Sequence, residues 1–149
     1  MLNHLVRRNY TAALRALERG DLDTLLKNVD PACELTFVGE SALSAPRLVG
    51  GNIRAWFERY VRLIPERRFE IMRFASAGPL WRREVAAHVV VRGRLADGSL
   101  YDNQFAHFLS VHKGRIVSDL VLEDTQRWAG ASDRLAVAGI EEASASPIR

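Results

Sequence analysis

Residues 84–122 decide the fold and read EVAAHVVVRGRLADGSLYDNQFAHFLSVHKGRIVSDLVL. Apolar and polar side chains alternate along most of this stretch, which is typical of strands that bury one face. Two turn signals, Asp97-Gly98 and Lys113-Gly114, interrupt the alternation. The stretch therefore predicts an antiparallel meander with strands over 84–95, 100–111 and 115–122.

The sequence before this meander is mostly helical in pattern. Ile53, Trp56 and Tyr60 share one face of a helix that Asn52 caps and Pro65 ends. We assign this aromatic stripe to the core rather than to a cofactor site. Helices followed by an antiparallel sheet predict the α+β class. The other expected elements are helices over 3–19 and 22–29, strands over 34–38 and 68–75, and a loop over 39–51.

Composition bounds the domain organisation. Hydrophobic residues make up 48% of the 149 residues, enough for one buried core that needs no metal or disulfide. We predict a single domain over residues 1–130 and a C-terminal tail over 131–149 that is frayed or docked on a partner. The only cysteine, Cys33, excludes an intrachain disulfide and a cysteine-ligated zinc site.

Charge and hydropathy exclude two classes of partner. The chain has 21 basic residues, of which 19 are arginine, and 18 acidic residues. The basic residues are scattered, whereas a nucleic-acid footprint is a basic stripe with interleaved aromatics. No apolar run approaches the roughly 20 residues of a membrane span. Because Met1–Tyr10 also lacks the apolar core of a secretory signal, we expect a cytoplasmic protein that binds neither nucleic acid nor membrane.

The turn at Asp97-Gly98 predicts which residues face one another. A two-residue type I′ turn at this dipeptide places side chains from both strands on one face. The facing pairs are then His88 with His107, Val90 with Phe105, and Arg92 with Asn103.

The turn at Lys113-Gly114 allows two registers. A two-residue turn places Asn103 opposite Asp124. A three-residue turn, with Gly114 in the left-handed position of a bulge, places His107 opposite Asp119. In that second register Phe105 faces Val121 and Asn103 faces Glu123.

A row of two histidines and a carboxylate suits proton transfer. The carboxylate Asp119 fixes the tautomer of His107, which keeps a nitrogen free to move a proton near neutral pH. His88 is the expected partner acid, and Arg92 with Asn103 is expected to hold a developing oxyanion. The alternative is a satisfied polar ladder on a solvated face. The expected substrate-binding residues are Arg92, Asn103, Phe105, Val90, Val121, Glu123 and Trp128, and this chemistry requires no metal and no organic cofactor.

Three stretches carry a family resemblance: ALRALERGDLD at 13–23, GGNIRAWF at 50–57, and residues 98–124 with their Lys113-Gly114 turn and closing Glu123-Asp124. In order and spacing they resemble the nuclear-transport-factor-2-like superfamily, in particular its SnoaL-like, ketosteroid-isomerase and limonene-epoxide-hydrolase branches. The resemblance implies a cone-shaped, cystatin-like fold, in which a curved antiparallel sheet packs on N-terminal helices. It also implies a small-molecule pocket between sheet and helices, and a homodimer.

The resemblance does not carry over the known catalytic groups. The helix tyrosine of the isomerase falls on Ala13 and its base aspartate on Phe37, so steroid isomerisation by that mechanism is not implied. The water-activating residues of the epoxide hydrolase fall on His88, Val90 and Val121. The comparison puts these last positions on the pocket face, which favours the bulged register at Gly114.

These observations predict a small-molecule pocket protein. We expect an acid–base enzyme of the cyclase, isomerase or dehydratase type, acting on a small apolar or polycyclic carbonyl compound. One alternative is a non-catalytic ligand-binding or protein-interaction domain of the same fold. Another is a structural subunit resembling the beta subunit of ring-hydroxylating dioxygenases.

Overall fold

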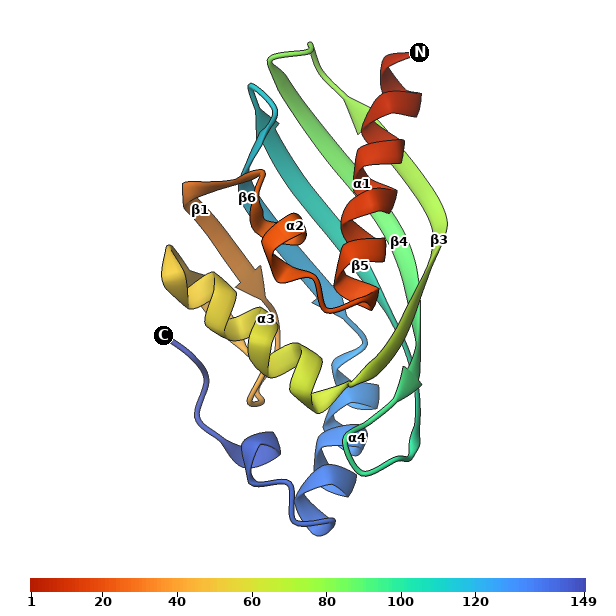
Figure 1. Ribbon diagram of the computed structural model, residues 1–149, viewed down its shortest axis with the longest axis vertical. Coiled ribbons are helices and arrows are strands. Elements are labelled where there is room, and N and C mark those ends of the chain that lie inside the picture. Colours follow the sequence, from red (N-terminus) through yellow and green to blue (C-terminus); the bar gives the residue numbers. More distant parts are fainter.

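The computed structural model describes residues 1–149 and consists of a curved, unclosed six-stranded sheet with helices on its inner face (Figure 1). The predicted α+β class is confirmed. The helices are α1 (Leu2–Glu18), α2 (Leu22–Leu26), α3 (Gly51–Leu63) and α4 (Thr125–Val137), with a 3₁₀ helix, η1 (Glu141–Ser144). The strands are β1 (Val29–Phe37), β2 (Ala45–Leu48), β3 (Glu66–Ala77), β4 (Arg82–Arg94), β5 (Leu100–His112) and β6 (Arg115–Glu123).

The core lies between the sheet and the helices α1, α2 and α3, which cover the sheet in the view of Figure 1. The aromatic stripe of α3 is in this core, as predicted, because Trp56 and Tyr60 are both buried. Asp21 caps α2 by accepting from the backbone N–H of Thr24. At α3 the cap is Gly50, and the Asn52 side chain instead donates to the backbone oxygen of Arg149.

The strands are ordered β2-β1-β6-β5-β4-β3. The meander from β3 to β6 is antiparallel as predicted, but β1 runs parallel to β6. A short strand, β2, forms within the expected loop over 39–51 and pairs with β1. The register of β3 shifts between Ile71 and Arg73. Such a bulge bends a strand, and here it helps curve the sheet around α1.

The predicted turn between β4 and β5 is wrong by one residue. Only Gly98 of the Asp97-Gly98 pair has a left-handed backbone, with a φ of 85°, whereas a type I′ turn requires positive φ at both positions. Asp97 instead accepts from the N–H and hydroxyl of Ser99, an Asx turn that favours a longer loop. The backbone bond from Leu95 N–H to Ser99 oxygen closes this loop. As a result His88 pairs with Ala106 and Ala87 pairs with His107.

The turn between β5 and β6 has the two-residue form. Lys113 and Gly114 both have positive φ, 49° and 79°, as a type I′ turn requires. The register then shifts near Val117, so that His107 pairs with Val121 and Leu109 pairs with Asp119. Asp119 therefore lies two residues along β6 from Val121, the pair of His107, and on the same face of the sheet as His107.

Parts of the segment 131–149, expected to be a frayed or partner-docked tail, pack against the rest of the chain. The expected boundary at residue 130 falls inside α4. Ala131, Leu135 and Ala143 are buried in the core cluster, and Arg62 of α3 makes a bidentate ion pair with Glu142. No helix is long and apolar enough to cross a membrane.

Candidate functional site

Three side chains from three elements form a hydrogen-bonded chain on the inner face of the sheet. The Nδ1 atom of His107 (β5) is 2.8 Å from the hydroxyl of Tyr10 (α1). Its Nε2 atom is 2.8 Å from Oδ1 of Asp119 (β6). The contact predicted between His107 and Asp119 is thus present, although the two residues are diagonal rather than directly opposite. We call this set the Tyr10–His107–Asp119 relay.

Aromatic packing fixes the geometry of the relay. The Tyr10 ring lies 5.5 Å from the rings of Phe74 and His107. Phe105, predicted to bind substrate, contacts His107 edge-on at 5.8 Å. Contacts at these distances between ring centroids are favourable and limit rotation of the imidazole. The side chains of His107 and Asp119 remain 13% and 14% exposed.

The protonation of the relay follows from burial and charge. Burial raises the pKa of Tyr10, and the negative charge of Asp119 raises it further. The phenol therefore keeps its proton at neutral pH and donates it to Nδ1 of His107. The imidazole proton is then on Nε2 and is donated to Asp119. Both ring nitrogens are occupied, so the expectation that His107 keeps a free nitrogen is wrong.

The oxygen atoms at the two ends of the relay are therefore the groups able to meet a ligand. Tyr10 lines a pocket of about 330 Å³ between α1, the end of α2 and the sheet. The second oxygen of Asp119 has no hydrogen-bond partner and is not among the buried unpaired atoms. In such an arrangement the carboxylate (Asp119) orients the imidazole (His107), and the imidazole activates the hydroxyl (Tyr10).

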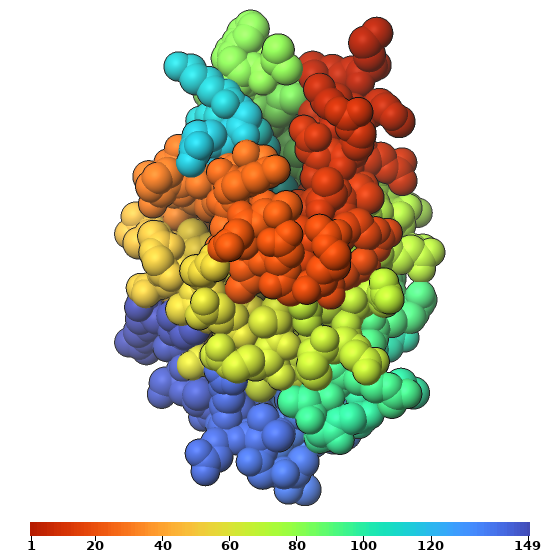
Figure 2. Space-filling model, viewed as in Figure 1, coloured from red at the N-terminus to blue at the C-terminus, as the bar shows by residue number.

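The pocket lies beside the relay, where the helices and the far ends of β4 to β6 meet. In Figure 2 this region is hollowed between the red N-terminal helix and the cyan β5–β6 hairpin. Leu109, the neighbour that pairs with Asp119, lines the pocket. Twelve of the 18 lining residues are hydrophobic. A mostly apolar cavity of this size, with a few polar groups, is typical of a small-molecule site.

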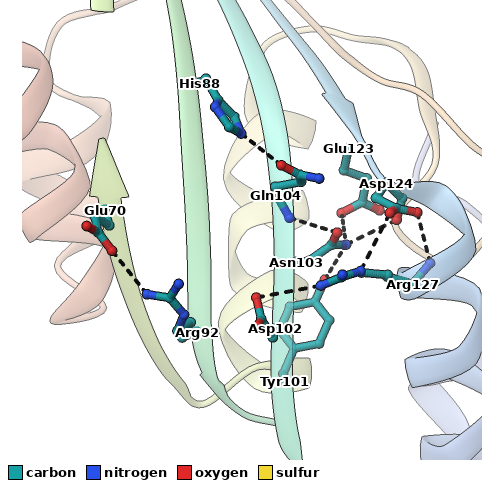
Figure 3. A network of polar contacts seen from close by, with 10 residues as sticks. All are labelled: Glu70, His88, Arg92, Tyr101, Asp102, Asn103, Gln104, Glu123, Asp124 and Arg127. Atoms are coloured by element: carbon teal, nitrogen blue, oxygen red, sulfur yellow. Dashed lines mark hydrogen bonds and ion pairs between the residues drawn. The ribbon is translucent and has the colours of Figure 1, made fainter. Parts of the chain in front are cut away.

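Three predicted site residues lie on the outer face of the sheet, away from the relay. The one-residue error at the β4–β5 turn exchanges the two faces of β4. His88 therefore bonds to Gln104 at 2.9 Å, and Arg92 forms an ion pair with Glu70 at 3.0 Å (Figure 3). Val90, opposite Gln104, shares this face. The predicted pairing of His88 with His107, of Val90 with Phe105 and of Arg92 with Asn103 is therefore wrong, and these residues of β4 do not share the face of His107.

A second polar cluster gathers other predicted residues on the inner face, apart from the pocket (Figure 3). Asn103 is fully buried, and its Nδ2 atom lies 3.0 Å from the Tyr101 hydroxyl and 3.4 Å from Oε2 of Glu123. Oε1 of Glu123 is buried without a partner. Burial raises the pKa of Glu123 to about 8, and the charge of Asp124 adds to this. The Glu123 carboxyl group therefore stays protonated at pH values well above the usual pKa range of a carboxyl group.

Two further residues predicted to bind substrate, Val121 and Trp128, lie among other side chains of the protein. Val121 points inward between the relay and the second cluster, as the pair of His107. Trp128 is buried in α4, where its ring packs edge-on against Tyr101 and its Nε1 donates to the Ser41 hydroxyl. Trp128, expected to bind substrate, does not line the cavity that Tyr10 lines.

Sequence reasoning missed Tyr10. The resemblance placed the functional helix tyrosine at Ala13, and Tyr10 precedes that position by three residues. Residues three apart lie on the same face of a helix, so Tyr10 faces the sheet as a tyrosine at position 13 would. The signal that could have identified Tyr10 was a tyrosine about one helical turn before the expected position.

Cys33 is a buried thiol beside the relay. Burial raises its pKa to about 12, with the Asp119 charge contributing next. It therefore stays protonated at neutral pH and acts as a small apolar residue.

The chain is similar to several solved structures. It matches PrhC from Penicillium brasilianum with a TM-score of 0.79 and 14% identity, covering 93% of each chain. IdmH, a candidate polyketide cyclase from Streptomyces antibioticus, matches with a TM-score of 0.68 and 18% identity over 84% of this chain and 96% of that one. AclR, a candidate hydroxylase from Streptomyces galilaeus, matches with a TM-score of 0.69 and 13% identity over 92% and 86%. At these identities the likeness shows the fold.

Sequence comparison identifies the family. No curated protein matches the chain. The model of the SnoaL-like domain matches residues 10–119, a span that starts at Tyr10 and ends at Asp119 and so contains the whole relay. The chain therefore belongs to the SnoaL-like domain family, within the NTF2-like superfamily.

Proposed function

We propose that the protein is an acid–base enzyme that moves a proton on a small, largely apolar carbonyl compound. The observation that carries the proposal is the Tyr10–His107–Asp119 relay, because one end of it lines an apolar pocket. The candidate cyclase IdmH among the similar structures is consistent with chemistry on polyketide-like carbonyl compounds.

The proposed step is removal of a proton from the carbon next to the carbonyl. The Tyr10 oxygen takes this proton while its own proton passes to Nδ1 of His107. The resulting imidazolium donates both N–H groups, and Asp119 stabilises its charge through Nε2–H. The electron pair of the broken C–H bond forms the enolate. Return of the proton to a different carbon completes an isomerisation. In a ring closure the enolate carbon instead attacks a second carbonyl carbon of the substrate, the electron pair of that C=O π bond moves to its oxygen, and this oxygen takes the proton. In both cases the relay ends unchanged.

The first test uses a simple bicyclic ketone, 2-tetralone, in D₂O. The protein is expected to accelerate deuterium uptake at the carbons next to the carbonyl by at least about 100-fold over buffer, as positioned general bases do. The measurement is loss of the corresponding ¹H NMR signals. Ala13→Phe, which fills the pocket from α1, is expected to abolish the acceleration. A wild-type rate equal to that of buffer contradicts the proposal and favours a protein that only binds ligands.

We also propose that the chain forms a homodimer through the outer face of its sheet. Exposed apolar side chains on this face are contiguous across the strands: Phe108 pairs with Ala86 on one side and Leu120 on the other, and Leu122 pairs with Ala106. Phe108 and Leu122 are 42% and 41% exposed. Contiguous apolar surface of this kind marks association sites.

Light scattering during size-exclusion chromatography tests the dimer. The wild type is expected at twice the 16.7 kDa chain mass, and Phe108→Asp at the mass of one chain, because a buried unpaired carboxylate strongly disfavours association. Trp81→Asp is the control, since Trp81 is an exposed aromatic residue on the β3–β4 hairpin, off this patch. A monomeric wild type, or a dimeric Phe108→Asp variant, contradicts the proposed interface.

A further inference from the structure

One wall of the pocket contains a buried guanidinium with no acidic partner. Arg83 on β4 is only 6% exposed. Its Nη2 atom donates to Asn3 Oδ1 at 2.6 Å and to Ser76 Oγ at 2.9 Å, and its Nη1 atom donates to the backbone oxygen of Gly78. All of these acceptors are neutral, and none of the ion pairs in the structure includes Arg83. Its Nε atom is buried without any partner.

The other strongly buried arginine shows how the chain neutralises such a charge elsewhere. Arg67 is 5% exposed and donates to the backbone oxygens of Leu17 and Ile64. These oxygens lie at the C-terminal ends of α1 and α3, where the helix dipole favours a cation. Arg83 has no helix end of this kind. A buried charge that lacks compensation is costly, so the surroundings of Arg83 suit an anion supplied from outside the chain.

The pocket is positively charged as a whole. Arg83 and Lys27 both line it, and no aspartate or glutamate does. Lys27 is exposed and makes no ion pair. The remaining wall is largely apolar. This combination complements a molecule with an apolar body and one anionic end.

We infer that the ligand is an aromatic or alicyclic carboxylic acid whose carboxylate binds Arg83 and Lys27, an inference that rests on the proposed function for the role of Tyr10. A carboxylate accepts charge-assisted hydrogen bonds from arginine N–H groups, and Nε is the Arg83 nitrogen that has no partner. Asn3, which holds Arg83, and Tyr10 are seven residues apart on α1, or about 10 Å along the helix. The carboxylate and the reacting carbon are thus separated by the length of a molecule of two or three fused rings.

The test compares a matched pair of probes, 2-naphthylacetic acid and 2-naphthylacetamide, by isothermal titration calorimetry. The wild type is expected to bind the acid at least 10-fold more tightly than the amide. Arg83→Met is expected to reduce this preference to within 2-fold, and Lys27→Glu to reduce it by at least 5-fold. The control is Arg92→Met on the outer face, which keeps the wild-type preference.

Equal binding of acid and amide by the wild type overturns the inference, and so does an unchanged preference in Lys27→Glu. The second variant decides the matter even where Arg83→Met fails to fold, since Lys27 is at the surface. The 2-tetralone assay separates this result from the proposed function. If the wild type prefers the acid but does not accelerate deuterium uptake, the carboxylate site stands and the proposed catalysis fails. If it accelerates uptake but does not prefer the acid, only the inference of a carboxylate site is overturned.

Discussion

Tyr10→Phe is expected to lower the rate of deuterium uptake into 2-tetralone by about 100-fold or more. The substitution removes the single oxygen that connects the pocket to His107. The ring keeps its packing against Phe74 and His107, so the free energy of unfolding changes by only about 1–2 kcal/mol, the contribution of one hydrogen bond. The rate is followed by NMR at equal protein concentration and below the unfolding transition.

The matched control for this variant is Tyr101→Phe. Tyr101 is also a buried tyrosine on the inner face, and its hydroxyl also makes a side-chain hydrogen bond, here as the acceptor from Asn103 Nδ2. It does not line the pocket of Tyr10. The control is expected to keep the rate within about 2-fold of the wild type, whereas equal rates in both variants would remove Tyr10 from the mechanism.

Glu123→Gln is expected to change how stability depends on pH. In the folded chain, burial raises the pKa of Glu123 from the ordinary carboxyl value of 4.5 to about 8. Between these values the folded chain keeps the proton and the unfolded chain has released it. The wild type therefore loses stability as pH rises through this window, by roughly 3–5 kcal/mol from this group. The loss is complete above the folded-state pKa.

The glutamine variant has no proton to lose at this position, so it lacks this loss of stability with rising pH. Urea unfolding of wild type and variant at pH 5 and pH 9 measures it: the variant gains stability relative to the wild type as the pH rises. Glu70→Gln on the outer face is the control, because Glu70 is 60% exposed and its replacement is expected to leave the pH dependence unchanged. If the difference in free energy of unfolding between the wild type and Glu123→Gln is the same at both pH values, the buried position of this carboxyl group is contradicted.

The sequence was sufficient for the order of α1 to α3 and of five of the six strands, but it did not predict α4. The alternation over residues 84–122 and the turn dipeptides indicate three antiparallel strands, and the stripe of Trp56 and Tyr60 indicates the core helix. The short strand β2 was not predictable, because Ala45–Leu48 is only four residues long, too short to show a clear alternation. The parallel pairing of β1 with β6 depends on tertiary contacts.

The candidate site shows why register decides such predictions. Around the β4–β5 turn the expected pairing is wrong by one residue, and a slip of one exchanges the faces of a strand, so His88 and Arg92 move outside. Around β6 the favoured pairing is wrong by two residues: one comes from the two-residue turn at Lys113-Gly114, and the other comes from the bulge near Val117. A slip of two keeps the face, so His107 and Asp119 still meet. The turn forms depended on the φ angles of Asp97 and Lys113, which residue type alone does not determine.

The most direct test of the relay as the catalytic centre is the ratio of two deuterium-uptake rates, measured on 2-tetralone with His88→Ala and His107→Ala. These histidines lie on neighbouring strands but on opposite faces of the sheet. The account predicts that His88→Ala is at least about 100-fold faster, because only His107 can take the proton of Tyr10. Equal rates in two folded variants would contradict it.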